Sequence, residues 1–330
     1  MQRAILDVLQ QSDDLPRVRE ILSTPTSIGG IPGRGTAHAI DLIENARRAG
    51  NANFVAGSDI SGFFTQIDQA AVVRFIREQT DDDDFVDLFS RALRVELANA
   101  SEMDPEELKL FPTDSVGVAQ GCPLSALAGN IVLRDFDSSL NGRNITCIRY
   151  IDDFMLLGRR ESSVKKAFEN ASNQLAALSM AVYHPATRPD KAFQGKLGDN
   201  FDFLGYQIVP GSYPPAKKNR DQVLDSVRQE LDCGRSHILK ILRVGSEGKP
   251  LQCYAQTLDA VDALLRAWSG SFSASRSLTV ARELDDAVNA MISDFIAFYR
   301  QKTNGRTLIE KRRALGVHLI EDDVNWRVGS

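Results

Sequence analysis

The sequence predicts an α+β fold with an all-helical C-terminal part, and two observations lead to that prediction. Up to about residue 215, short apolar and β-branched runs alternate with amphipathic helical spacing, which is typical of a sheet covered by helices. From about residue 221 onward, the apolar residues recur at helical spacing. The chain has 330 residues, of which 43% are hydrophobic and 25% charged, as expected for a globular protein of one or two domains.

Three segments predict the strands of the sheet. Residues 53–60 form an apolar run short enough for a buried strand. Residues 147–158, CIRYIDDFMLLG, place apolar residues on both sides of an Asp pair, which favours a turn, so they predict a hairpin with two carboxylates at its tip. Residues 201–209 predict a further strand, and the apolar spacing over 163–182 predicts a helix packed on the sheet.

Composition and charge indicate where in the cell the protein is located and which kinds of partner it has. No apolar run approaches the about 18 residues of a membrane span, and the N-terminus is charged where a signal peptide is apolar. We therefore expect a cytoplasmic protein without a membrane partner. The net charge is −5, yet residues 210–330 hold 18 Lys and Arg against 15 Asp and Glu. That imbalance is compatible with a face that binds a nucleic-acid backbone, and equally with chance.

Three aspartates are candidates for a metal centre. Asp59 lies near the end of the first predicted strand, and Asp152 and Asp153 lie at the hairpin tip, so all three can converge on one face of the sheet. Clustered carboxylates repel one another unless cations lie between them, and their hard oxygens suit Mg²⁺. Two such ions serve nucleotidyl transfer. Taken singly, a strand-end Asp is usually a helix cap and an Asp pair usually a turn; their joint occurrence carries the prediction.

The segments around these aspartates resemble the motifs of the reverse transcriptase family. YIDDFMLLG at 150–158 is similar to the Tyr-x-Asp-Asp motif, and SDISGFFTQID at 58–68 is similar to the first catalytic motif of group II intron and related bacterial enzymes. VAQGCPLSALAGNIVL at 118–133 resembles the loop and helix between them, and FDFLGYQI at 201–208 resembles the primer grip. Four motifs occur in the family's order, and the likeness extends over about residues 28–300.

The resemblance implies a set of metal ligands and a nucleotide-selecting residue. Asp59, Asp152 and Asp153, with the backbone carbonyl of Ile60, are implied to hold two Mg²⁺ ions, for which Mn²⁺ could substitute. Phe64 is implied to lie under the sugar of the incoming nucleotide, where its ring leaves no room for a 2′-hydroxyl. Plain core packing is the alternative for Phe64.

Further nucleotide-binding residues follow from the same resemblance. Gln120 and Gly121 are implied to lie beside the nascent base pair, where Gly permits a close backbone approach, and a structural turn is their alternative. Lys191 is implied to supply charge or a proton to the leaving pyrophosphate, although its spacing is looser than the family pattern. A plain surface lysine is the alternative.

Five residues are implied to contact the primer or the template. Arg34, in a Gly-rich loop, is a candidate for template or triphosphate contact, and a surface arginine is the alternative. Tyr150 belongs to the Tyr-x-Asp-Asp motif. Leu204, Gly205 and Tyr206 are implied to support the primer strand.

The implied architecture is a polymerase right-hand palm with reduced fingers and a helical thumb. Residues 1–50 form the reduced fingers, 51–215 the palm with the catalytic centre, and 216–330 the helical thumb and C-terminal tail. Because only 58 residues precede Asp59 and residues 1–25 show no strand pair flanked by Lys or Arg, most of the fingers is expected to be missing. A partner subunit, a structured noncoding RNA or a second copy of the chain is expected to supply that function.

The leading functional prediction is Mg²⁺-dependent synthesis of a DNA product from deoxynucleoside triphosphates on an RNA template, within a protein or RNA–protein assembly. The resemblance to minimal bacterial enzymes adds a role in antiphage defence as an expectation. Two alternatives stay open. One is template-independent or unconventionally templated synthesis by the same site, and the other is a catalytically idle RNA-binding scaffold.

Overall fold

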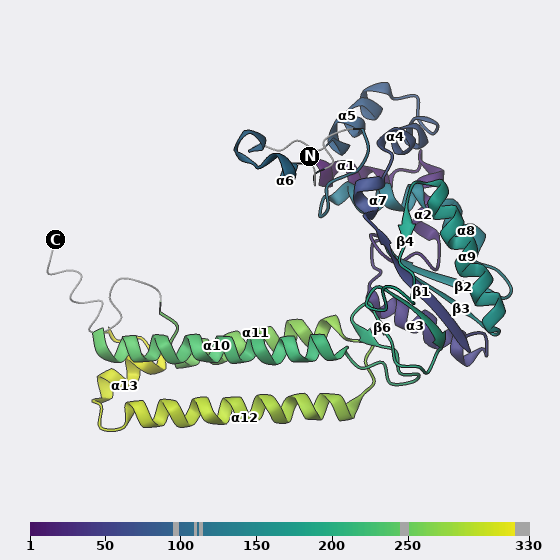
Figure 1. Cartoon of the computed structure of the whole chain (residues 1–330). Helices are drawn as coiled ribbons and strands as arrows, with labels where there is room; N and C mark the ends of the chain where they lie inside the picture. Colours follow the sequence, from purple (N-terminus) through teal and green to yellow (C-terminus); the bar gives the residue numbers. More distant parts are fainter. Residues whose placement is uncertain (95–98, 109–110, 112–114, 245–250, 321–330) are drawn as a thin grey trace. The chain divides into compact units, whose positions relative to one another are not determined.

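The computed structural model describes residues 1–94, 99–108, 111, 115–244 and 251–320, and the chain forms two compact units (Figure 1). The first unit comprises Met1–Leu204 and Ile208–Gly211, and the second comprises Gly205–Gln207 and the chain from Ser212 onward. Residues 321–330 of the predicted C-terminal tail lie outside the described residues.

An antiparallel sheet forms the centre of the first unit. Its strands are β1 (Phe54–Ser61), β2 (Ile145–Tyr150), β3 (Asp153–Gly158), β4 (Ala181–Val182) and β5 (Ala192–Lys196). β3 lies between β2 and β1, and the other edge of β1 pairs with β5 along its first part and with β4 at its end. The predicted α+β class, an antiparallel sheet with packed helices, is thereby confirmed.

Nine helices of the described residues surround or extend this sheet. They are α1 (Gln2–Gln11), α2 (Pro16–Ser23), α3 (Thr36–Arg48), α4 (Gln69–Arg77), α5 (Asp83–Leu93), α6 (Pro105–Leu108), α7 (Pro123–Val132), α8 (Arg134–Leu140) and α9 (Glu161–Ala177). Short 3₁₀ turns span Phe63–Gln66 and Ala100–Glu102. One apolar core joins the sheet to α1, α2, α4, α5 and α7–α9.

Helix α9 follows the predicted apolar stripe over most of its length. Val164, Phe168, Ala171 and Leu175 are buried on the face that packs on β1 and β3. The prediction that the helix continues to residue 182 is wrong. It ends at Ala177 because Ser179 takes a left-handed φ of 60°, which α-helical geometry excludes, and β4 follows.

The predicted continuous strand over 201–209 is also wrong. The segment contains two short strands, β6 (Asp202–Phe203) and β7 (Tyr206–Gln207). Leu204 and Gly205, which separate them, have φ angles of 50° and 82°. Two successive left-handed residues turn the chain, so an extended strand cannot pass through them.

The second unit is helical from Lys217 onward within the described residues, as the sequence predicts. It contains α10 (Lys217–Val244), α11 (Tyr254–Ser271), α12 (Leu278–Thr303) and α13 (Leu308–Leu315). Its apolar core is contributed by α10–α13, and the rings of Tyr254 and Phe295 stack 5.4 Å apart within it. None of the described helices of the chain has the length and apolar character that a bilayer span requires. The division of residues 1–50 and 51–215 into fingers and palm stays a prediction.

Candidate active site

The strand register brings the three candidate aspartates together at one end of the sheet. Asp59 on β1 lies opposite Asp153, the first residue of β3. Asp152 occupies the two-residue turn between β2 and β3, and its carbonyl accepts a 2.9 Å hydrogen bond from the Ile60 amide. The predicted hairpin with carboxylates at its tip is therefore present, and β1 delivers the third carboxylate to the same place.

The three carboxyl groups have different proton affinities. Burial raises the pKa of Asp153 to about 8, and its hydrogen bond with Asp59 and the neighbouring negative charges add to that effect. Burial also raises the pKa of Asp152, helped by the charge of Asp59. Burial opposes ionisation of Asp59 too, but hydrogen bonds from Asp153 and Lys191 outweigh it and lower the pKa of Asp59. The site therefore holds an ionised Asp59 beside a protonated Asp153 near neutral pH.

Lys191 is a cation that lines this site within the described residues. Its ammonium group forms an ion pair with the Asp59 carboxylate, and its backbone carbonyl accepts a 3.1 Å hydrogen bond from the Asp59 amide. The hydrogen bond to Asp59 raises the pKa of Lys191. The Lys191 side chain is 43% exposed, so it can leave Asp59 when another cation takes its place.

A cavity of about 410 Å³ opens beside the aspartates. Six of the residues singled out from the sequence line it, and they come from β1, the following turn, the 118–120 loop, the hairpin tip and the segment before β5. They are Asp59, Ile60, Phe64, Gln120, Asp152 and Lys191. The geometry thus assembles one polar cavity from segments that are more than 100 residues apart in the sequence.

The packing of Phe63 in the core determines where its neighbour Phe64 lies. The Phe63 ring is buried and packs where Gly129 of α7 has no side chain, since a Cβ there would lie 2.6 Å from the ring. Phe64, in edge contact with Phe63 at 5.2 Å, is only half-buried and lines the cavity. Its carbonyl accepts a 2.7 Å hydrogen bond from the Val118 amide, which ties the 118–120 loop to the cavity wall.

Gln120 and Gly121 lie in an exposed turn before α7. Gln120 lines the cavity, whereas Gly121 is not among the lining residues. Gly121 has a φ of 85°, and a Cβ added there would meet no atom within 4 Å. The turn therefore requires glycine for its backbone conformation, and it leaves open space above that backbone.

The remaining candidates lie outside the lining of this cavity. The Arg34 guanidinium donates hydrogen bonds to the carbonyls of Thr24 and Ser27, at 2.7 Å for Ser27, so it binds the chain's own backbone. Tyr150 is half-buried opposite Asp153.

Leu204 lies in the first unit, while Gly205 and Tyr206 belong to the second. Tyr206 is buried there, with its hydroxyl donating to the Ser271 carbonyl at 3.2 Å. The primer and template roles of these residues stay predictions.

Arg149 was not identified as a site residue from the sequence. It is fully buried and lies two residues before the turn. Its guanidinium forms a two-point ion pair with Asp137 of α8, at 2.7 and 2.5 Å, and donates to the Ile151 carbonyl at 2.8 Å. Ile151 has a φ of 60°, a strained conformation for a β-branched residue. Arg149 therefore holds the turn that carries Asp152.

The same guanidinium connects the turn to the N-terminal segment. It donates to Ser27 and to Asn130 of α7, both at 2.9 Å. The Asn130 amide donates to the Gly29 carbonyl at 3.1 Å, and a Cβ on Gly29 would lie 2.4 Å from Ile151. A charged residue within the apolar run CIRY was the only sequence signal for this network, since charges within buried strands are usually paired.

The donor set fits divalent cations, although Lys191 forms an ion pair with Asp59. Among the described residues, no three carboxylate, imidazole or thiol groups surround one point. Yet three partly buried carboxyl groups lie at one end of the sheet, and burial together with the neighbouring carboxylates raises the pKa of Asp153 to about 8. Hard oxygen ligands with this surplus of negative charge suit Mg²⁺, which would displace both the Asp153 proton and Lys191.

Comparisons with known proteins identify a family for the first two thirds of the chain. The family model described as reverse transcriptase (RNA-dependent DNA polymerase) matches residues 1–208. No curated protein sequence matches the chain.

Solved structures of telomerase are similar to the chain. Apo telomerase from Candida tropicalis aligns at 13% identity and a TM-score of 0.48, covering 98% of this chain and 60% of that one. Telomerase from Candida albicans with a fragment of telomeric RNA aligns at 15% identity and a TM-score of 0.44, covering 94% and 51%. The chain thus spans 51–60% of the length of these telomerase chains.

Proposed function

Because the chain belongs to the reverse transcriptase family, the family of RNA-dependent DNA polymerases, we propose that it synthesises DNA from deoxynucleoside triphosphates at the Asp59, Asp152 and Asp153 centre. One observation supports this most strongly. The register that places Asp59 opposite Asp153 also brings Asp59 and Asp152 into the wall of one cavity, together with an aromatic ring and a lysine.

The residues of the cavity divide the work of nucleotidyl transfer. Asp59, Asp152 and Asp153, with the Ile60 carbonyl, would hold two Mg²⁺ ions, which when bound supply positive charge to the attacking hydroxyl and the phosphates. Lys191, which lines the cavity and forms an ion pair with Asp59, would offer its positive charge to the triphosphate when metal ions neutralise Asp59. Gln120 borders the same space and would contact the incoming base pair.

Replacing Phe64 by Val is expected to relax the selection for deoxynucleotides. A smaller side chain leaves room for a 2′-hydroxyl, so the ratio of kcat/KM for a deoxynucleotide to that for the matching ribonucleotide should fall about 10- to 100-fold. Steady-state incorporation of dUTP and UTP opposite adenine measures the ratio. Thr65→Ala, at an exposed neighbouring position of the same cavity, is the control and should leave the ratio unchanged. An unchanged ratio in Phe64→Val would assign Phe64 to packing alone.

We further propose that the chain works within an assembly that completes template binding. The chain segment before β1 packs against the catalytic turn. Ser27 accepts a hydrogen bond from Arg149, and Gly29 packs against Ile151. Arg34 donates a hydrogen bond to the backbone of the same segment. These groups are therefore not free to grip a template. A protein subunit, a structured RNA or a second copy of the chain would supply that grip. The group II intron-like motifs support a bacterial enzyme acting in the cytoplasm, with antiphage defence as its proposed role.

The nature of the product tests the proposed function. The purified chain, with and without RNA that co-purifies with it, is given Mg²⁺, four deoxynucleotides and a DNA primer annealed to a defined RNA template. The proposal predicts a product whose sequence is complementary to that template. A product unrelated to any RNA present would instead indicate template-independent synthesis. No incorporation in either preparation would indicate a scaffold whose carboxylates are idle, despite the repulsion that these clustered groups impose.

A further inference from the structure

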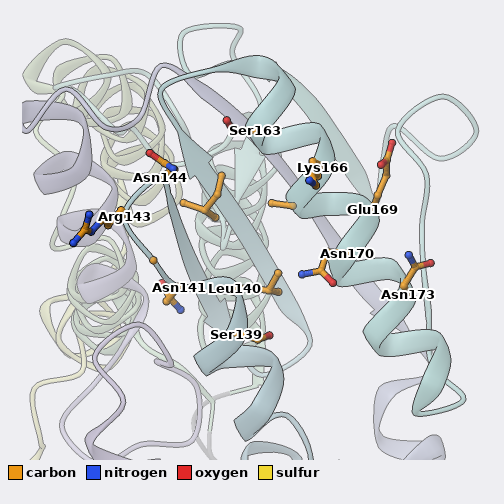
Figure 2. Close-up of a pocket in the computed structure, with 13 residues that line it drawn as sticks. Ser139, Leu140, Asn141, Arg143, Asn144, Ser163, Lys166, Glu169, Asn170 and Asn173 are labelled. Atoms are coloured by element: carbon orange, nitrogen blue, oxygen red, sulfur yellow. The ribbon is translucent and has the colours of Figure 1, made fainter.

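A second hollow, of about 540 Å³, lies at the opposite end of the β2–β3 hairpin from the aspartates. It is formed by the end of α8, the loop leading into β2 and one face of α9 (Figure 2). Ile145 and Gly158 pair at this end of the hairpin, whereas Tyr150 and Asp153 pair at the catalytic end. Five residue steps of a strand separate the two ends, about 17 Å. The two cavities have no lining residue in common.

Five of the polar side chains that line this hollow have no bonding partner among the described residues. Arg143 and Lys166 are exposed, and so are the amides of Asn144, Asn170 and Asn173. Within the described part of the chain, none of these five side chains makes a hydrogen bond or an ion pair.

Three exposed arginines of the N-terminal segment differ from Arg143. Arg3, Arg17 and Arg19 are each paired with a carboxylate, at 2.7–3.0 Å. The hollow is thus lined by two cations and three amides that have no hydrogen-bond or ion-pair partner among the described residues.

The wall of the hollow is fixed by an internal bond network. The Asn141 side chain accepts a 2.9 Å hydrogen bond from the Cys147 amide and donates to the Asp137 carbonyl at 2.7 Å. The Gly142 amide donates to the Ile145 carbonyl at 3.0 Å, which closes the loop on itself. The loop that presents Arg143 and Asn144 is thus held in place without a ligand, so binding there costs little ordering of the chain.

The chemistry of the hollow matches RNA. Free cations bind phosphates, and free amides donate and accept hydrogen bonds at once, as base edges and a 2′-hydroxyl require. Leu140, Ile145 and Ala167 add apolar surface on which a base or a sugar can lie. Arg159 and Arg160, exposed and unpaired in the described structure, follow β3 directly at this end and extend the positive charge. Glu169 and the three amides make an acidic peptide a poorer match.

We propose that this distal hollow, defined by Arg143, Asn144, Lys166, Asn170 and Asn173, binds a single-stranded segment of RNA that is not the template being copied. Anchoring RNA about 17 Å from the catalytic turn leaves the cavity beside Asp59 free for primer and nucleotide. The anchoring role rests on the proposed function, whereas the binding chemistry does not.

Charge reversal at the hollow tests the binding. The probe is a fluorescein-labelled 12-nucleotide single-stranded RNA of mixed sequence, added to protein saturated with an unlabelled primed template. Arg143→Glu/Lys166→Glu is expected to weaken binding at least about tenfold and to reduce the slope of log Kd against log salt by about 1–2. Arg3→Glu/Lys165→Glu changes the net charge equally. Both of its residues are exposed and lie outside the hollow, so it should bind like the wild type.

A second pair of measurements identifies the ligand class. Asn170→Ala/Asn173→Ala is expected to reduce the preference for RNA over DNA of the same sequence at least about threefold, and a 4-thiouridine probe should cross-link to residues 139–145 and 163–173. Equal affinities of the two charge-reversal variants would overturn the proposal. So would equal binding of the DNA probe by the wild type, or displacement of the RNA by an oligoglutamate peptide.

Primer extension on a short primed template separates this proposal from the proposed function. Arg143→Glu/Lys166→Glu should extend the primer as well as its charge-matched control does, because the hollow is remote from the catalytic turn. If no protein extends the primer while RNA binding still depends on Arg143 and Lys166, the proposed function fails and the RNA site stands.

Discussion

Asp153→Asn is expected to abolish DNA synthesis and, in the absence of metal, to make the protein more stable than the wild type. Asn cannot replace the charge of a metal ligand, so incorporation should fall at least about 10³-fold. Asn can, however, donate a hydrogen bond to Asp59 as the protonated Asp153 does, and it carries no charge to be buried. The Asp153→Asn substitution should therefore lower the rate of DNA synthesis and raise the free energy of unfolding of the metal-free protein.

The stability gain should depend on pH in a defined direction. The pKa of Asp153 is raised from 3.8 to about 8 by burial and by its bond to Asp59. A raised carboxyl pKa stabilises the folded state fully below the unfolded pKa, and that contribution is lost as the pH rises through the folded pKa. The metal-free wild type should thus lose stability between about pH 4 and pH 8, whereas Asp153→Asn should not lose this contribution.

Thermal and urea unfolding in EDTA measure this difference. At pH 8 the variant should be more stable by about 1–3 kcal/mol, since one pKa unit corresponds to about 1.4 kcal/mol and solvent partly screens the site. Saturating Mg²⁺ should stabilise the wild type and remove its disadvantage. Asp14→Asn, at an exposed position, is the charge-matched control. It should change neither the stability at pH 8 nor the response of stability to Mg²⁺. Identical pH profiles for the wild type and Asp153→Asn in EDTA would contradict the assigned electrostatics.

Arg149→Met is expected to cause the largest loss of stability among the substitutions considered. It leaves the Asp137 carboxylate buried without its partner, and breaking a buried ion pair in this way typically costs about 3–5 kcal/mol. The Asp137 side chain is only 7% exposed, so water cannot replace the guanidinium without opening the contact between α8 and β2. Urea unfolding of the wild type and the variant measures the loss directly.

A double variant separates the effect on folding from the effect on the turn. Arg149→Met/Asp137→Leu removes both charges and should recover most of the stability, because an apolar pair of similar volume is often as stable as a buried ion pair. The Ile151 carbonyl still lacks its donor, so DNA synthesis should stay at least about tenfold below the wild type, with a raised Mg²⁺ requirement. Full recovery of activity in the double variant would show that Arg149 contributes only to folding.

The sequence predicted the parts of the site that depend on local pattern. Apolar and β-branched residues on both sides of Asp152 and Asp153 indicated a hairpin, and the register of β1 with β3 places Asp59 at the same end of the sheet. The apolar stripe of α9 was equally readable, because helical periodicity is a local property.

The features that the sequence did not predict depend on long-range contacts or on unusual backbone angles. Arg149 lies between Ser27, Asn130 and Asp137, partners that only the folded chain brings together. The ion pair of Lys191 with Asp59 joins residues 132 positions apart. The left-handed conformations at Ser179 and Leu204 occur without a glycine at either residue, so no composition signal marked the ends of those elements.

Primer extension by Asp152→Asn tests the central claim, that the hairpin aspartates form the catalytic metal centre, most directly. Asp152 holds Ile60 through its backbone carbonyl, so the substitution leaves that contact intact while removing the carboxylate charge. On a primed RNA template with Mg²⁺, under conditions in which the wild type extends the primer, Asp152→Asn should incorporate at least about 10³-fold less deoxynucleotide while keeping the circular-dichroism spectrum of the folded wild type. Incorporation by a folded Asp152→Asn at a rate within tenfold of the wild type would contradict the account.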